Sequence, residues 1–231
     1  MKDVIIACDF SSEQDLFNFL DKFGSETPYL KIGMELYYAC GPDIVKKLKA
    51  RGHKIFLDLK LCDIPNTVMK AMSVLSNLDV DMCNIHATGT TEMMKGAIKG
   101  LTRPDGTRPL LIAVTLLTSI GEDALKNDLL INEPLDKTVM HLAKRASECG
   151  LDGVVCSPLE AQKVKDYCGQ NFITVTPGIR FSDSDKGDQT RIATPEFAKN
   201  NGSTYIVVGR PITASSNPLE AYLRCKKDFL G

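Results

Sequence analysis

The sequence predicts a closed (β/α)8 barrel, and three observations support this prediction. Short apolar runs rich in β-branched residues alternate with amphipathic helical segments from one end of the chain to the other. Eight such repeats fit within 231 residues, a length at which barrels of this type form a single domain. Most of the strand-like runs are continuously apolar, as parallel strands buried on both faces should be. An open doubly wound sheet is the alternative, but eight repeats favour closure.

Eight segments are predicted as strands. They are Val4–Cys8, Tyr29–Ile32, Lys54–Leu59, Met82–His86, Leu110–Leu116, Gly153–Cys156, Phe172–Thr176 and Tyr205–Val208. Because a helical segment follows each run, the strands should pair in parallel through right-handed crossovers. No linker or break in composition divides the chain, so residues 1–231 are expected to form one catalytic domain, a TIM barrel.

Eight helices are predicted in strict alternation with these strands. The first three have apolar residues at helical spacing within 16–23, 44–48 and 68–78. Ser11 and Ser12 are suited to cap the first helix, and Pro42 and Gly52 should bound the second. The later helices are expected near Met93–Ile98, Leu135–Cys149, Pro158–Tyr167, Thr194–Asn200 and Leu219–Phe229.

The composition predicts an ordinary globular protein of the cytoplasm. The chain is 43% hydrophobic and 25% charged, with a formal net charge of −1. This balance gives no reason to expect a nucleic-acid or membrane partner. No apolar run reaches the length of a signal peptide core or a membrane-spanning helix. The eight cysteines are scattered without a Cys-x-x-Cys spacing, so neither a zinc site nor a disulfide framework is expected.

Charged residues gather around the end of the third predicted strand. Asp58 and Lys60 are two residues apart in a strand and should therefore face the same side. Asp63 follows closely, while Lys31 and Asp9 lie near the ends of the two preceding strands. Active sites of these barrels lie at the carboxyl ends of the strands. A structural salt-bridge network is the competing interpretation, but desolvating several charges together is costly, which favours a site for a charged substrate.

A second group of polar residues follows the last two strands. Gly209 and Arg210 come directly after the eighth strand, and the polar loop 181–191, which contains Gln189, follows the seventh. In this fold the loops after these strands commonly bind phosphate. Glycine allows a backbone N–H to approach an anion closely, and arginine adds a fork of donors. The loop is interpreted as a lid, although an ordinary solvated loop is the alternative.

Five motifs together resemble the orotidine 5′-phosphate decarboxylase family, in its compact bacterial monofunctional form. They are Asp58-Leu59-Lys60-Leu61-Cys62-Asp63-Ile64-Pro65-Asn66-Thr67, Val114–Ser119, Val175–Arg180, Asp188-Gln189-x-Arg191 and Val207–Thr213. The resemblance implies decarboxylation of orotidine 5′-phosphate (OMP) to UMP and CO2 in de novo pyrimidine biosynthesis, without a metal or cofactor. Such a reaction must lower its barrier by electrostatics and positioning.

The resemblance also implies roles for the charged cluster. Lys60 would protonate C6 of the pyrimidine, and Asp58 would lie beside the scissile carboxylate and keep Lys60 charged. Lys31 would hold Asp58 and reach the ribose, whose hydroxyl Asp9 would bind. The catalytic set is therefore expected to comprise Lys60, Asp58, Asp63 and Lys31.

Further substrate contacts are implied on other strands and across a homodimer. Asp63, Ile64 and Thr67 would reach the neighbouring subunit's site, so that each site is completed across the interface. The remaining implied contacts are Thr118 and Ser119 to the base, and Arg180, Gln189, Gly209 and Arg210, mostly at the phosphate.

One departure and two alternatives accompany this assignment. Cys62 stands where related sequences usually have histidine, which removes a titratable group but no assigned chemistry. His86 is interpreted as a positioning residue rather than a catalyst. A magnesium-dependent sugar-phosphate decarboxylase or aldolase of the same superfamily would share the Asp-x-Lys-x-x-Asp core but lack the continuation 63–67. A nucleotide-binding barrel without catalysis would have no use for Lys60.

Overall fold

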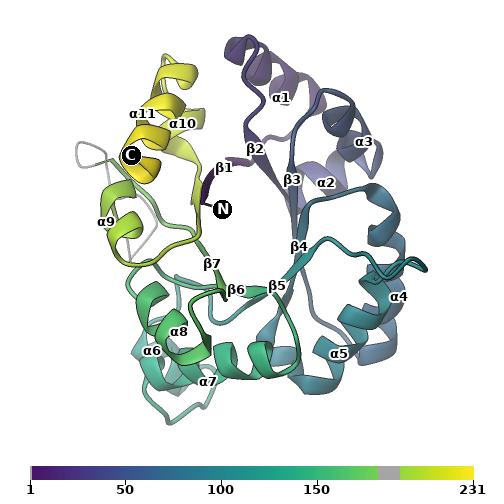
Figure 1. The fold of residues 1–231 in the computed structure, drawn as a ribbon, viewed down its shortest axis with the longest axis vertical. Helices are drawn as coiled ribbons and strands as arrows, with labels where there is room; N and C mark the ends of the chain where they lie inside the picture. Colours follow the sequence, from purple (N-terminus) through teal and green to yellow (C-terminus); the bar gives the residue numbers. More distant parts are fainter. Residues whose placement is uncertain (1, 182–192) are drawn as a thin grey trace.

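Eight parallel strands close into a barrel in the computed structural model, which describes residues 2–181 and 193–231 (Figure 1). The strands follow one another around the barrel in chain order, and β1 pairs with β8 in the register Ile6↔Val208 to close it. Figure 1 shows the helices arranged around the outside of the ring of strands. The predicted fold class is confirmed, and the open doubly wound sheet is excluded.

The strands lie where the apolar runs predicted them, with shifts of one or two residues at some ends. Their bounds are β1 (Asp3–Cys8), β2 (Tyr29–Gly33), β3 (Ile55–Leu61), β4 (Met82–His86), β5 (Leu110–Val114), β6 (Gly153–Val155), β7 (Ile173–Thr176) and β8 (Tyr205–Val208). The extension of β3 to Leu61 places both Asp58 and Lys60 inside a strand. Lys31 likewise lies in the middle of β2, not at its exit as the sequence suggested.

All eight predicted helices are present, but their strict alternation with the strands was wrong. The predicted helices are α1 (Glu13–Leu20), α3 (Asp43–Ala50), α4 (Pro65–Leu75), α5 (Thr90–Leu101), α7 (Leu135–Glu148), α8 (Ala161–Cys168), α9 (Pro195–Asn200) and α11 (Pro218–Leu230). Three short helices were missed, namely α2 (Met34–Cys40), α6 (Glu122–Asn127) and α10 (Arg210–Thr213). Each is four to seven residues long, too short for an apolar face to repeat at helical spacing.

Alternate residues of each strand contribute to two different cores. In β1, Val4 and Ile6 pack outward against the helices, whereas Ile5 and Ala7 face the barrel interior. The interior cluster takes one or two side chains from most strands: Ile5, Ala7, Tyr29, Phe56, Met82, Ile112, Val175 and Val207. This alternation follows from the two-residue period of a strand. It determines which residues can reach the barrel mouth, because the next inward residue after each core residue lies one layer higher.

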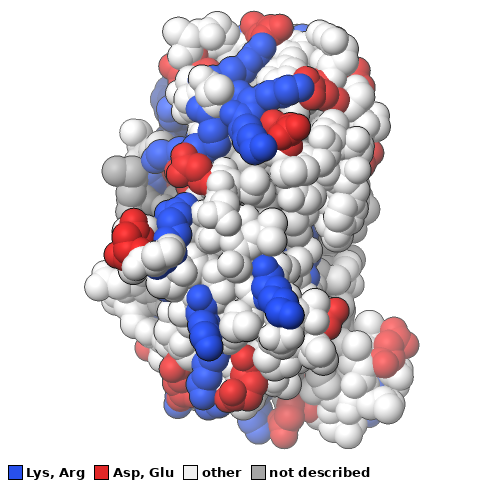
Figure 2. Space-filling model, turned by 90° about the vertical axis from the view of Figure 1, so that its right-hand side faces the viewer, with Lys and Arg blue, Asp and Glu red and all other residues white. Residues whose placement is uncertain are grey.

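The outer surface carries charges of both signs. On the face that carries α3 to α5, Figure 2 shows lysine and arginine side chains interspersed with acidic ones. Several form ion pairs, including Lys47 with Glu13 and Arg51 with Asp21. In residues 2–181 and 193–231, no helix is long and apolar enough to cross a membrane.

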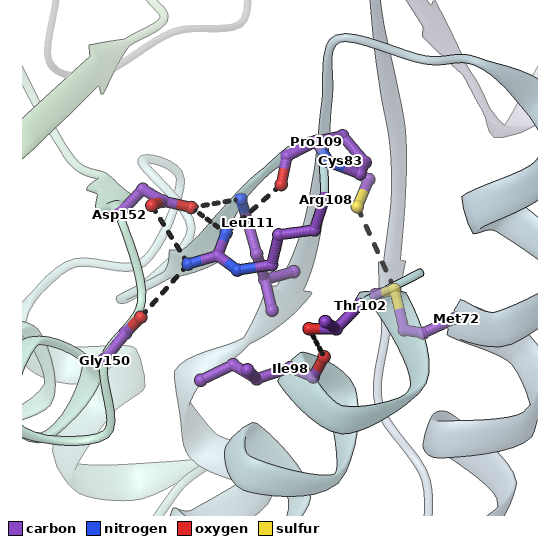
Figure 3. Close-up of polar contacts among 9 residues, drawn as sticks. All are labelled: Met72, Cys83, Ile98, Thr102, Arg108, Pro109, Leu111, Gly150 and Asp152. Carbon is purple, nitrogen blue, oxygen red and sulfur yellow. Dashed lines mark hydrogen bonds and ion pairs between the residues drawn. The ribbon is translucent and has the colours of Figure 1, made fainter. Parts of the chain in front are cut away.

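An arginine–aspartate pair joins neighbouring strands at the amino end of the barrel (Figure 3). Arg108 precedes β5 and binds the carboxylate of Asp152, which precedes β6. Asp152 also accepts the backbone N–H of Leu111 at 2.7 Å, and Arg108 donates to the carbonyls of Pro109 and Gly150 at 3.1 and 3.3 Å. Both charged groups therefore direct their hydrogen bonds to each other and to the backbone.

Candidate active site

Two neighbouring strands bring three charged side chains together at the carboxyl end of the barrel. In β3, Leu57 and Leu59 face the helices, so Asp58 and Lys60 face the interior directly above Phe56. In β2, Lys31 faces inward above Tyr29 by the same alternation. The pairing of Lys31 with Phe56, two residues before Asp58, brings these charges to the same end of the barrel. The prediction that Asp58 and Lys60 share a side is confirmed.

The charges form a chain of alternating sign. Lys60 Nζ lies 2.8 Å from Asp58 Oδ1, and Lys31 Nζ lies 3.3 Å from Asp58 Oδ2. Lys31 Nζ also lies 3.1 Å from Oδ1 of Asp9, which follows β1. The Asp58 side chain is only 9% exposed, whereas that of Asp9 is 60% exposed. Asp58 is therefore a buried carboxylate held between two ammonium groups, and Asp9 is the solvent end of the chain.

The protonation states follow from burial and from these neighbours. Burial alone would raise the pKa of Asp58, but Lys31 and Lys60 outweigh it and hold that pKa below its usual value. Burial likewise works to lower the pKa of Lys31, and Asp58 and Asp9 overcome it so that the pKa is raised. Asp58 is thus a carboxylate and Lys31 an ammonium at neutral pH. Burial, reinforced by Lys60, lowers the pKa of His86, which ends β4.

The backbone of β3 is irregular where it carries Lys60. The pairing of β3 with β4 shifts register between Leu57 and Leu61, and Lys60 has a φ of 52°. Positive φ is uncommon for a residue other than glycine and costs on the order of 1–3 kcal/mol. The Lys60 N–H donates to Oδ1 of Asn84 in β4 at 2.8 Å. This contact replaces a hydrogen bond that the regular ladder would otherwise supply.

A cavity of about 320 Å³ opens beside these charges. Its polar lining consists of Lys31, Asp58, Lys60, Thr118 and Ser119. The rest of its lining is apolar: Phe56, Val114, Leu116, Leu117, Val155, Val175, Pro177 and Val207. A paired ammonium beside a small, largely apolar cavity is suited to stabilise a carbanion and then to protonate it.

Asp63 lies apart from this cluster. Its carboxylate accepts the N–H of Ile64 at 2.6 Å, and in the described parts of the chain it forms no ion pair. Cys62 to Thr67 are all exposed, and Ile64 is 66% exposed. Thr67 lies in the first turn of α4. Asp63 is close to Asp58 and Lys60 in the sequence, but it follows the end of β3 and does not line the cavity of its own chain.

The predicted phosphate-binding residues follow β7 and β8. Arg180 is buried, and its guanidinium donates to the carbonyl of Ile179 at 2.8 Å. Gly209 precedes the four-residue helix α10, and Arg210 is its exposed first residue. Gln189 and most of the proposed lid loop lie outside the described residues.

Sequence reasoning missed two components of the site. The apolar lining of the cavity reads as ordinary barrel core in the sequence, because only closure of the barrel shows which core residues reach the mouth. Asn84 was also missed, although a buried amide inside the apolar strand Met82–His86 is a usable signal. Asn84 donates to Asp58 Oδ1 at 2.6 Å in addition to accepting from Lys60.

Comparison with known proteins gives concordant relationships over the full chain. The family described as "Orotidine 5'-phosphate decarboxylase / HUMPS family" matches residues 2–225. Orotidine 5′-phosphate decarboxylases of Bacillus cereus and Bacillus thuringiensis are each 52% identical over 233 residues, covering 100% of this chain and 98% of theirs. The crystal structure of the Lactobacillus acidophilus decarboxylase superposes with a TM-score of 0.90 at 44% identity and covers 100% of both chains. An uncharacterized conserved protein from Geobacillus kaustophilus gives a TM-score of 0.87 at 45% identity, covering 98% of this chain and 99% of its own.

Proposed function

The chain belongs to the orotidine 5′-phosphate decarboxylase family and is a carboxy-lyase that converts OMP to UMP in pyrimidine biosynthesis, and we propose that Lys60 is its proton donor. The observation that carries this assignment is the 2.8 Å pair between Lys60 Nζ and the buried Asp58. This pair holds the Lys60 ammonium at the wall of a cavity that Lys31, Asp58 and Lys60 line together.

The proposed chemical step depends on stabilising the negative charge that develops on C6, and no covalent intermediate with the protein is needed. The bond between C6 and the carboxylate breaks, CO2 leaves, and the electron pair remains on C6. The Lys60 ammonium stabilises that pair through space and then transfers a proton to it. Asp58, with its lowered pKa, stays ionised and holds the Lys60 side chain in place through their ion pair.

The far end of the substrate would be held by the residues after β7 and β8. We assign the phosphate to Gly209, Arg210, Arg180 and Gln189, the ribose to Asp9 and Lys31, and the base to Thr118 and Ser119. The short helix after β8 and the exposed guanidinium of Arg210 suit an anion. Binding energy from the phosphate, remote from C6, can then contribute to the chemical step.

A spectrophotometric assay of OMP conversion with and without EDTA tests this function. Turnover should be unchanged by the chelator, because the proposed step uses only side chains of the protein. Loss of turnover with EDTA and its return with Mg²⁺ would instead favour the metal-dependent chemistry of sugar-phosphate enzymes in the same superfamily.

We further propose that the enzyme is a homodimer whose sites are shared. Asp63, Ile64 and Thr67 are exposed and do not line their own chain's cavity, and the apolar side chain of Ile64 is 66% exposed. A second copy that covers this surface would remove apolar area from water and bring Asp63 into the partner's cavity. The free state of all eight cysteines suits a cytoplasmic enzyme.

Mixing two inactive variants tests the shared site. In a heterodimer of Lys60→Ala with Asp63→Ala, one site would combine the intact Lys60 of one subunit with the intact Asp63 of the other. Random reassociation of equal amounts makes about half of the dimers heterodimers, and each heterodimer has one intact site of two. The mixture should therefore regain about a quarter of wild-type activity. If Asp63 served its own subunit, every site would carry a defect and the mixture would stay inactive.

A further inference from the structure

Asn84 is buried against the charged cluster without belonging to it. It is 1% exposed and lies in β4 between Cys83 and Ile85, both of which face the outer core. Its amide therefore faces the barrel interior. A buried amide is tolerated where its hydrogen bonds are satisfied. The two identified partners of the Asn84 amide are the backbone N–H of Lys60 and the carboxylate of Asp58, both in β3.

The two hydrogen bonds of Asn84 hold two different parts of β3. Its carbonyl oxygen accepts the backbone N–H of Lys60 at 2.8 Å, and its NH2 donates to Asp58 Oδ1 at 2.6 Å. The same Asp58 oxygen binds Lys60 Nζ at 2.8 Å. Asn84 thus closes a small ring that joins the backbone of Lys60, its ammonium and its counterion.

The register shift explains why such a ring is needed. Leu57 pairs with Cys83 and Leu61 pairs with Ile85, so three residues of β3 lie opposite Asn84 alone. Where three residues face one, the regular backbone hydrogen bonds between β3 and β4 cannot all form. A residue with positive φ persists only where its surroundings fix it, and the Asn84 side chain supplies such a restraint on Lys60.

We propose that Asn84 is a positioning residue that fixes the Lys60 ammonium over the reacting carbon through the backbone of Lys60 and the carboxylate of Asp58. This inference rests on the proposed role of Lys60 as proton donor. Asn84 does not line the cavity, so we assign it no contact with substrate or product. Its effect is therefore expected on the chemical step, with little effect on the binding of UMP, whose phosphate, ribose and base are assigned to other residues.

The first test separates kcat from binding in Asn84→Ala. We expect kcat to fall by about 10²-fold, because a displacement of a catalytic group such as the Lys60 ammonium by roughly 1 Å has an effect of that size. The affinity for UMP, measured by calorimetry, should change by less than about fivefold. Thr176→Val is the matched control: Thr176 is fully buried and hydrogen-bonded to Ser203 at 2.9 Å, but lies on β7 beside the inward-facing Val175. It should keep wild-type kcat.

Asn84→Asp provides a second test that does not depend on removing volume. When protonated, the introduced carboxyl group reproduces the asparagine pattern, because its O–H donates to Asp58 and its C=O accepts from Lys60. Two adjacent carboxyls share a proton, which raises the pKa of the pair. Lys31 from β2, Lys60 from β3 and His86 from β4 also face this group, and β5 (Leu110–Val114) contributes no ionisable side chain.

The sign of the pH effect follows from that pattern. For Asn84→Asp, kcat relative to wild type should be highest at low pH and should fall as rising pH ionises the pair. Wild-type kcat in Asn84→Ala, or in Asn84→Asp at a pH where the pair is ionised, would overturn the proposal. Parallel losses of kcat, UMP affinity and thermal stability in Asn84→Ala would also overturn it. Lys60→Ala is measured alongside. If it retains turnover, the proposed role of Lys60 as proton donor fails, whereas an inactive Lys60→Ala with an unaffected Asn84→Ala removes only the role of Asn84.

Discussion

The two ends of the barrel use the same kind of charged pair in opposite ways. At the amino end, Arg108 and Asp152 bind each other and the backbone of neighbouring strands (Figure 3). At the carboxyl end, Lys60 and Lys31 bind a buried Asp58 and also face a cavity. The first arrangement uses charge to hold strands together. The second holds charge at a cavity wall, where it can act on a bound molecule.

This contrast teaches that residue type alone does not distinguish a structural pair from a catalytic one. What differs is where the remaining hydrogen-bonding capacity points. Changes at the carboxyl end should therefore lower activity more than stability, and changes at the amino end should do the reverse. Single substitutions at each end of the barrel test that division.

Replacing the proposed proton donor should have the largest effect. In Lys60→Ala, kcat/KM should fall by at least about 10⁴-fold, because both carbanion stabilisation and proton donation are lost. UMP should still bind, and the melting temperature should change little. The measurement is the OMP assay together with calorimetric titration of UMP. Substantial retained turnover would remove Lys60 from the mechanism.

Replacing the buried carboxylate should affect both activity and the pH dependence of stability. Asp58→Asn should lower kcat by about 10³-fold, because Lys60 loses the counterion that places it. The folded pKa of Asp58 is lowered, so its ionised form stabilises the fold above the ordinary aspartate pKa. That stabilisation is lost as the pH falls through the lowered value.

Thermal unfolding across pH checks this sign. The wild type should melt above Asp58→Asn at pH 7, and the difference should shrink below about pH 4. A difference that grew on acidification would contradict the assignment of Asp58 as an ionised partner of Lys31 and Lys60.

Arg210, the proposed phosphate contact, lies at the same end of the barrel, and its removal should lower activity less than the loss of Lys60 or Asp58. Arg210→Ala should lower kcat/KM by about 10²-fold, because a charge-assisted contact to the phosphate is lost. Free phosphite should partly restore turnover of a substrate that lacks its phosphate, if phosphate binding assembles the site. Absence of any restoration would count against that coupling.

The smallest effect on activity is expected at the amino end. Asp152→Ala should lower the free energy of unfolding by about 2–3 kcal/mol, because Arg108 and the N–H of Leu111 lose a charged partner. Its kcat should equal that of the wild type. Asp136→Ala is the control, since Asp136 pairs with Lys163 on the exposed surface and its loss should leave the melting temperature nearly unchanged. Reduced kcat in Asp152→Ala would break the proposed division.

Much of the site was predictable because strand periodicity is local. The apolar runs located all eight strands, and the two-residue spacing of Asp58 and Lys60 correctly placed both side chains on one face of a strand. Whereas the family resemblance implied that Asp63 serves the partner's site, the same reasoning could not separate Asp63 from this pair, since the spacing cannot show that Asp63 lies beyond the end of β3. It also failed for the short helices α2, α6 and α10, which have too few residues to display a period.

The sequence by itself determined the barrel, the charged cluster and the family resemblance, because each depends on residues close together or on motifs in order. Only the tertiary structure revealed the register shift at Lys60 and the ring closed by Asn84. Those contacts join residues 24 and 26 positions apart in the chain. Their existence depends on which side chain of β4 meets the irregular part of β3, and the register in which these two strands pair decides that.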